Sequence, residues 1–235
     1  MRDFAGATGT ALLERETSVD PQVGFATSAN GGRFYLKLGK RALDIFVVLF
    51  TIWMTLPVIL ICAAVTMLDG GLPFYGHRRV GLNGREFRCW KVRSMVSDSA
   101  ARLDARLATD PDARAEWDAS RKLKHDPRVT RFGRFLRTSS LDELPQIFNV
   151  LMGEMSIVGP RPVVRDELAL YGLKRRGYLE MRPGITGLWQ ISGRNEVSYA
   201  ARVAFDQEYR DTFSLRRDVA IIFQTFRVVL MRNGH

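Results

Sequence analysis

The stretch IFVVLFTIWMTLPVILICAAVTML, residues 45–68, carries no charged side chain and decides the architecture of this chain. As an α-helix rising ~1.5 Å per residue, it covers a hydrocarbon core of ~30 Å. Apolar side chains occupy every face of such a helix, and it is too long for the core of a small soluble domain. We therefore predict a membrane-embedded helix rather than a buried core helix.

Pro57 divides the apolar stretch into two nearly equal halves. It predicts a kink, because proline has no backbone N–H to donate. Both flanks of the stretch are basic, with Lys37, Lys40 and Arg41 before it and His77, Arg78, Arg79 and Arg85 after it. Basic flanks mark the cytoplasmic side of a membrane segment, so this pattern favours a re-entrant hairpin that enters and leaves by one face. A kinked helix that crosses the membrane once is the alternative.

The composition points to a reducing compartment and an anionic partner. The 235 residues include 35 Lys+Arg and 25 Asp+Glu, a formal net charge of +10. This excess favours nucleic acid, an anionic membrane leaflet or a phosphorylated substrate, and charge alone does not separate them. The two cysteines make no disulfide framework, and the Cys and His residues lack zinc-site spacing, so a cytoplasmic setting is the simplest interpretation.

These patterns divide the chain into three regions. Residues 1–33 are rich in small and polar side chains and lack the apolar core and cleavage site of a secretory signal, so we predict a disordered tail. Residues 34–70 are the membrane-embedded helix. Residues 71–235 are a small cytoplasmic domain.

The cytoplasmic domain is predicted to be mainly α with a short β-hairpin. Residues 87–93 alternate like a strand after a turn at 81–84, which predicts a hairpin within 74–95. Helices are expected over 98–124 with a break near Asp110-Pro111, over 146–152 and over 219–231. Residues 128–137 place Arg at every third position with apolar residues between, a pattern that suits an amphipathic helix at the membrane interface. A solvated surface helix is the alternative.

Asp142 and Glu143 stand just before Pro145 at the start of a predicted helix. If Asp142 is the N-cap, Pro145 falls in the first turn and no helical hydrogen bond is lost. The structural interpretation is a capping Asp142 and a Glu143 that favours the helix dipole. The chemical interpretation is that the helix N-terminus lowers the pKa of Asp142, which acts as a nucleophile, while Glu143 binds Mg²⁺. Mg²⁺ prefers one or two carboxylates together with phosphate oxygens and water.

Cationic side chains near this pair in sequence suit phosphoryl transfer, which requires neutralisation of phosphate charge. The candidate phosphate- or nucleotide-binding residues from these patterns are Arg128, Arg161, Arg194 and Asp206. Arg161 is held between two prolines, although an exposed Arg in a rigid loop is the alternative. The Gly-rich residues 182–195 would suit a nucleotide stacked on Trp189, or a turn around a core Trp. For Asp206 and Tyr209 the alternative is a surface pair on a helix.

Several motifs occur in order along the chain: Pro57 in the apolar stretch, KVRSM at 91–95, DPR at 126–128, SLDELPQ at 140–146, GEMSIVGPRP at 153–162 and PGITG at 183–187. From about Lys37 onward the chain resembles the bacterial sugar transferases, the monotopic phosphoglycosyl transferases. It is most similar to those that initiate exopolysaccharide synthesis with galactosyl or glucosyl phosphate, without the extra N-terminal spans of the large members. One departure is Leu56, where the family often has Ser before the kink proline.

The resemblance implies transfer of a hexose-1-phosphate, galactose or glucose, from a UDP-sugar to undecaprenyl phosphate with release of UMP. This is the first step of exopolysaccharide repeat-unit assembly. By the same resemblance Asp142 forms an aspartyl phosphosugar, Glu143 binds Mg²⁺, and the phosphate contacts are Lys91, Arg93, Arg128 and Arg161. It also implies a catalytic domain that faces the cytoplasm at the bacterial inner membrane. Membrane lipid, a homo-oligomer and downstream glycosyltransferases are the further partners.

Two rival functions make different predictions. A membrane-bound glycosyltransferase would use the same donor but release UDP, so the released nucleotide distinguishes the two reactions. A membrane-tethered nucleic-acid binder would bind DNA or RNA with strong salt dependence. That function leaves Asp142 and Glu143 unexplained, and no nucleic-acid-binding motif is recognisable, so we expect no nucleic-acid partner. No residue that distinguishes glucose from galactose is identified.

Overall fold

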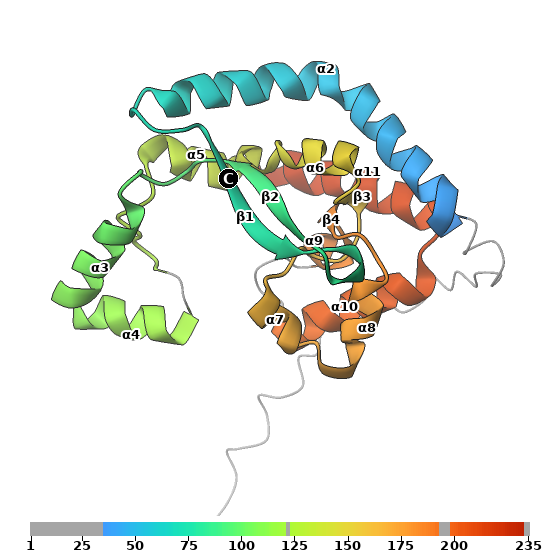
Figure 1. Cartoon of the computed structure of the whole chain (residues 1–235). Helices are drawn as coiled ribbons and strands as arrows, with labels where there is room; N and C mark the ends of the chain where they lie inside the picture. Colours follow the sequence, from blue (N-terminus) through green and yellow to red (C-terminus); the bar gives the residue numbers. More distant parts are fainter. Residues whose placement is uncertain (1–34, 121–122, 193–197, 233–235) are drawn as a thin grey trace, which may run out of the picture.

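The computed structural model describes residues 35–120, 123–192 and 198–232 (Figure 1). The predicted tail, residues 1–33, lies outside the described residues, and the division at residue 70 stays a prediction. The elements in chain order are η1 Tyr35–Gly39, α2 Lys40–Met67, β1 Phe74–Val80, η2 Leu82–Gly84, β2 Glu86–Val92, α3 Ser99–Thr109, α4 Pro111–Ser120, α5 Arg131–Ser139, η3 Leu141–Glu143, α6 Gln146–Met152, β3 Ser156–Val158, α7 Arg165–Ala169, η4 Gly172–Lys174, α8 Arg175–Leu179, β4 Gly184–Thr186, α9 Leu188–Ile191, α10 Tyr199–Thr212 and α11 Leu215–Arg232.

The predicted fold class, mainly α with a short β-hairpin, is confirmed. Strands β1 and β2 pair antiparallel from Phe74–Val92 to Val80–Glu86, around the predicted turn. The break between α3 and α4 falls at Asp110, and α6 has the predicted bounds. A parallel pair of short strands, β3 and β4, was not predicted. Each strand is only three residues long, too short to produce a recognisable alternation in the sequence.

Helix α2 contains the apolar stretch and continues through Pro57 as one helix, which changes direction along its length (Figure 1). Within the described residues it is the one helix long and apolar enough to cross a membrane. One side of it packs on the domain along both halves, through Val48 in the first half and Ile59 and Cys62 in the second. The other side exposes large apolar side chains, among them Phe46, Leu49, Phe50, Trp53, Met54, Leu60 and Ile61. The Thr55 hydroxyl donates to the carbonyl of Thr51, one turn back.

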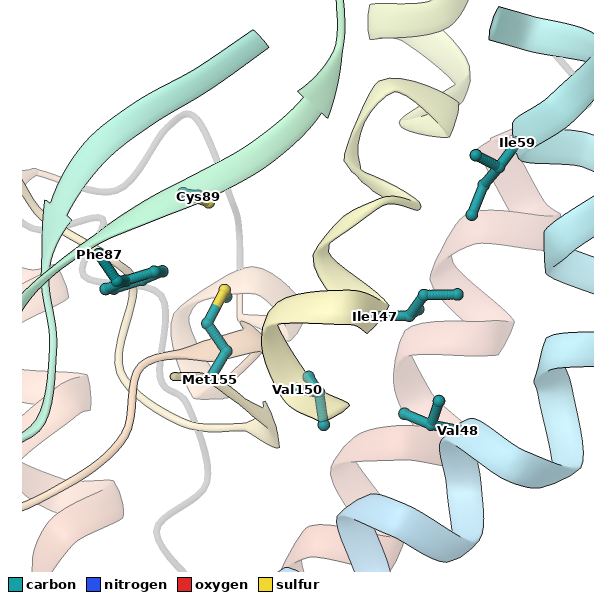
Figure 2. Packing of buried hydrophobic residues seen from close by; sticks show 7 residues of the cluster. All are labelled: Val48, Ile59, Phe87, Cys89, Ile147, Val150 and Met155. Carbon is teal, nitrogen blue, oxygen red and sulfur yellow. The ribbon is translucent and has the colours of Figure 1, made fainter. Parts of the chain in front are cut away.

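Helix α6 lies between α2 and the β1–β2 hairpin, and this sandwich forms a main part of the core (Figure 2). Ile147 faces Val48 and Ile59 of α2, whereas Met155, just after α6, lies beside Phe87 and Cys89 of β2. Because α6 is covered on both sides, its position relative to β2 is determined by packing.

Both ends of α2 are fastened to the domain by polar contacts, which are buried at the start of the helix and partly exposed past its end. At its start, the Lys40 ammonium donates to the Asp218 carboxylate at 2.7 Å and to the Tyr209 hydroxyl at 2.8 Å. Past its end, Arg93 forms an ion pair with Asp69 and donates to the carbonyl oxygen of Thr66. Since buried charges are costly unless they are paired, these contacts hold α2 in one position on the domain.

Candidate active site

The turn between α5 and α6 carries Asp142 and Glu143. Helix α5 ends at Ser139, and its C-cap is Ser140, whose φ of 59° and ψ of 17° lie in the left-handed region. This conformation is uncommon for a residue other than glycine, and it turns the chain sharply into η3. Asp142 therefore lies inside a 3₁₀ turn, and Pro145 takes the N-cap position of α6 without a side-chain cap. The prediction that Asp142 caps the helix is wrong, because Asp142 lies within η3 and the N-cap of α6 is Pro145, three residues later.

Lys91 of β2 lies against both carboxylates. Its ammonium nitrogen is 2.5 Å from Oε1 of Glu143 and 3.7 Å from Oδ2 of Asp142. Asp142 is buried, whereas the side chain of Glu143 is 40% exposed to solvent. The structure therefore brings together three of the predicted site residues, Lys91, Asp142 and Glu143, although Lys91 and Glu143 are 52 residues apart in the chain. One of the two carboxylates is buried and the other is open to solvent.

Asn149 of α6 keeps Lys91 in register with the carboxylates. Its fully buried side chain accepts from the backbone N–H of Trp90 at 3.0 Å and donates to the carbonyl oxygen of Arg88 at 2.7 Å. These two backbone groups precede Lys91 on β2. The Asn149 side-chain amide therefore satisfies one N–H and one C=O of β2, as the backbone of a neighbouring strand would. The sequence analysis missed Asn149, and the only available indication was a polar residue within the otherwise apolar residues 147–152 of α6.

Burial dominates the electrostatics of Asp142. Desolvation raises the pKa of its carboxyl above the ordinary value, with opposing contributions from Lys91 and from the more distant Arg137. The predicted lowering of this pKa by a helix N-terminus is therefore wrong. Burial by itself would lower the pKa of Lys91, but the charges of Glu143 and Asp142 outweigh it and raise that pKa. Arg137 is a further residue that sequence reasoning did not select.

Arg128 lies beside a cavity of about 440 Å³ rather than beside Lys91. Its guanidinium makes a two-pronged ion pair with Asp126, at 2.8 and 2.7 Å, and stacks on the Trp117 ring at 5.1 Å. Arg128 precedes α5, which starts only at Arg131 because the Thr130 side chain caps it through the N–H of Gly133. The predicted helix over 128–137 therefore begins three residues late.

Arg161, in the Pro-Arg-Pro loop, and Asp206 of α10 form a second group. The Arg161 guanidinium lies 5.2 Å from the centre of the Trp189 ring, which is also approached by Arg202 at 5.0 Å. Trp189 is buried, so it is a core residue and not the predicted stacking platform for a nucleotide. Asp206 is also buried and accepts from the Tyr171 hydroxyl at 2.7 Å and from the backbone N–H of Arg161.

Two of the predicted substrate-binding residues, Arg93 and Asp206, have their polar groups engaged by partners within the domain. Asp206 lacks the exposed surface needed to touch a substrate, and it positions the backbone of Arg161. The surface-pair alternative is wrong as well, since Tyr209 is buried too. Arg93 uses all five of its N–H groups on Asp69 and on the carbonyl oxygens of Leu72, Met95 and Thr66. No donor of Arg93 is left for phosphate. Arg194 lies outside the described residues.

The burial of Asp206 predicts a pH-dependent stability. Burial raises its pKa from 3.8 to about 7, so the folded state binds this proton more tightly than the unfolded state. Protonated Asp206 therefore contributes to the free energy of unfolding below about pH 4, and this contribution is lost as pH rises through 7. The loss amounts to about 1.4 kcal/mol for each unit by which folding raises the pKa. Asp206→Asn should therefore flatten the decline in Tm between pH 5 and 8, measured by thermal unfolding in nanodiscs. Asp166→Asn, at an exposed carboxylate, is the control, and parallel Tm profiles for wild type and Asp206→Asn would contradict this account.

The pair of carboxylates fits Mg²⁺ only together with a phosphorylated ligand. No cluster of three or more potential metal-ligating side chains occurs among the residues that the structure describes. Glu143 accepts from Lys91 yet keeps an open side, and such a site suits an ion that takes one or two carboxylates and completes its shell with phosphate oxygens and water.

Comparison with known proteins agrees with this arrangement. The family model described as bacterial sugar transferase matches residues 35–232. The chain belongs to the bacterial sugar transferase family. The match covers the apolar helix, the carboxylate pair and the Pro-Arg-Pro loop, and it confirms the resemblance drawn from the motifs.

Relatives of this sugar transferase differ in length. It is 53% identical over 195 residues to the UDP-galactose-lipid carrier transferase of Erwinia amylovora and 51% identical over 195 residues to the undecaprenyl-phosphate galactose phosphotransferase of Salmonella typhimurium. These alignments cover 83% of this chain but only 41% of either relative. The exopolysaccharide production protein ExoY of Rhizobium meliloti is 50% identical over 198 residues, 84% of this chain and 88% of ExoY.

Proposed function

We propose that this protein transfers a hexose-1-phosphate from a UDP-sugar to undecaprenyl phosphate and so begins assembly of an exopolysaccharide repeat unit. The observation that carries the proposal is the contact of Lys91 with two adjacent carboxylates, one buried and one open. Relatives named for a galactose carrier transferase, an undecaprenyl-phosphate galactose phosphotransferase and exopolysaccharide production support it. A relative named undecaprenyl-phosphate glucose phosphotransferase, 36% identical over 215 residues, keeps glucose as the second candidate sugar.

The first step is attack by the Asp142 carboxylate on the phosphorus attached to the sugar. The bond from this phosphorus to the bridging oxygen breaks, and the electron pair leaves with UMP. Asp142 is left as an aspartyl phosphosugar, so one difficult transfer becomes two easier ones. Lys91, close to both carboxylates, offsets the repulsion between the attacking oxygen and the donor phosphates.

The second step returns Asp142 to its starting form. An anionic oxygen of the lipid phosphate attacks the same phosphorus, the bond to Asp142 breaks, and the carboxylate leaves ionised. The product is a lipid diphosphate sugar. Mg²⁺ held by Glu143 and by substrate phosphate would neutralise charge on the non-bridging oxygens. The exposed side of Glu143 leaves room for that ion.

Identification of the released nucleotide tests the reaction class. Purified protein in nanodiscs containing undecaprenyl phosphate would be incubated with UDP-galactose, UDP-glucose and other UDP-sugars in turn. UMP release with sugar phosphate on the lipid supports the proposal, whereas UDP release would establish the alternative glycosyltransferase. The UDP-sugar with the highest kcat/KM identifies the donor.

The same proposal places the protein at the cytoplasmic face of the bacterial inner membrane, with α2 as a re-entrant element. Two observations support this placement. The exposed apolar side of α2 suits lipid. Both ends of α2 are fastened to one domain, through Asp218 at the start and through Arg93 at the end. A helix that crossed the membrane completely would carry one end away from that domain. A homo-oligomer and downstream glycosyltransferases stay predictions.

Topology can be measured with introduced cysteines. In a background with Cys62 and Cys89 replaced by Ala, a cysteine at Lys37 and a second variant with a cysteine at Arg85 should both resist impermeant thiol reagents in intact cells. Both should react once the inner membrane is permeabilised, because both flanks of α2 face the cytoplasm. Labelling of the Lys37 position alone in intact cells would establish a single span.

A further inference from the structure

A cavity of about 440 Å³ is lined by residues of α5 and of the segment before it, and Lys91 is not among them. Four cationic side chains line it, Lys124, Arg128, Arg134 and Arg137, together with the single carboxylate of Asp126. That carboxylate is already paired with Arg128. Lys124 donates its backbone N–H to Glu116, but among the described residues neither its ammonium group nor the Arg134 guanidinium forms an ion pair with a carboxylate. The cavity therefore carries an excess of positive charge and suits an anion.

Arg137 connects the cavity with the catalytic turn. Its side chain lines the cavity, its Nε donates to the Ser94 hydroxyl at 2.8 Å, and its charge acts on the carboxyl of Asp142. An anion held in the cavity therefore lies beside Arg137, a side chain whose charge also acts on Asp142. Arg137 and Lys91, whose charges both act on Asp142, come from different elements, α5 and β2.

The apolar side chains of α5 and of the neighbouring helix α2 favour a lipid over a soluble anion. Leu136 and Phe132 of α5 pack against Cys62 and Val58 of α2, so α5 lies directly beneath the second half of the apolar helix (Figure 1). Phe135 on α5 is 54% exposed, and Ile61 on α2 is 63% exposed. A molecule with an anionic head and a long apolar tail can therefore place its head in the cavity and its tail along these side chains.

We propose that this cavity binds the phosphate headgroup of the polyprenyl acceptor. The inference rests on the proposed function and assigns the acceptor a site built mainly by Lys124, Arg134 and Arg137. The phosphate is held by charge-assisted hydrogen bonds before one of its oxygens attacks the phosphorus on Asp142. The positive charge offsets the repulsion between this phosphate and the nearby carboxylates.

The two half-reactions separate acceptor binding from donor chemistry. Arg134→Gln and Lys124→Gln remove cavity charges that have no carboxylate partner, so the fold should be retained. In nanodiscs, each variant should raise the KM for undecaprenyl phosphate about tenfold, the cost of one charge-assisted hydrogen bond of ~1.4 kcal/mol. Release of UMP from UDP-sugar without acceptor should stay within about twofold of wild type. Arg131→Gln, exposed on the same helix but outside the cavity, is the matched control and should change neither quantity.

Three outcomes would overturn the inference. An unchanged acceptor KM in both cavity variants would mean that the cavity does not bind the acceptor. A raised KM for UDP-sugar with slower acceptor-free UMP release would place the donor there instead. If the activity of the protein responds to the phosphatidylglycerol content of the nanodiscs, and the cavity variants do not change the acceptor KM, the cavity is a site for bulk anionic lipid. If wild-type protein releases no UMP under any condition, the proposed function fails, which is distinguishable from all three.

Discussion

Asp142→Asn should abolish sugar-phosphate transfer and UMP release, lowering turnover by a factor on the order of 10³ or more. The substitution keeps the shape of the side chain but removes the anionic oxygen that attacks phosphorus. The fold should survive, because Asp142 makes no helix-capping bond and lies 3.7 Å from Lys91, whose closer partner is Glu143. Turnover would be measured as UMP release in nanodiscs with undecaprenyl phosphate.

Covalent labelling distinguishes a nucleophile from a metal ligand. Wild-type protein given UDP-sugar labelled in the sugar, without acceptor, should release UMP and retain the label, whereas Asp142→Asn should retain none. Asp104→Asn, at an exposed carboxylate of α3, is the control and should be labelled like wild type. Label on Asp142→Asn would identify another nucleophile. A requirement for both substrates before UMP leaves would indicate direct transfer, with Asp142 as a ligand of the metal.

Gly133→Ala should unfold or severely loosen the turn that carries the carboxylates. Gly133 is buried in α5, and a Cβ there would lie 2.6 Å from the carbonyl carbon and 2.8 Å from the Cα of Ser94. Both are backbone atoms, so α5 must move away from the segment after β2. We expect the free energy of unfolding to fall by about 1–3 kcal/mol or more, which is the usual cost of overpacking. UMP release should be lost in parallel. Thermal unfolding and UMP release in nanodiscs would measure both effects.

Gly172→Ala is the control for the general cost of replacing a glycine. Its added methyl group would meet no atom within 4 Å, but its φ of +51° is strained for alanine. A loss of about 1 kcal/mol is therefore expected, with UMP release retained. If Gly133→Ala loses no more stability than Gly172→Ala, the close approach of α5 to Ser94 does not constrain the turn.

The sequence by itself determined the elements that depend on local patterning. An uncharged apolar stretch predicts α2, the turn at 81–84 with alternating residues predicts the hairpin, and Pro111 predicts the break between α3 and α4. The carboxylate pair could also be found, because Asp142, Glu143 and Pro145 are close in the chain. Each of these inferences uses neighbouring residues, whose side-chain period and backbone preferences are properties of the local sequence.

Only the tertiary structure decided which charges meet. Lys91 reaches Glu143 across 52 residues, and Asn149 holds β2 from a helix 59 residues beyond Trp90. Arg93 and Asp206 were predicted to contact substrate, but the fold surrounds them with Asp69 and Tyr171, so their hydrogen bonds are used within the domain. The pKa of Asp142 changes in the direction opposite to the prediction, because burial in the packed domain raises it and outweighs the charges of Lys91 and Arg137. Burial and partner choice depend on residues distant in the chain, which no local pattern specifies.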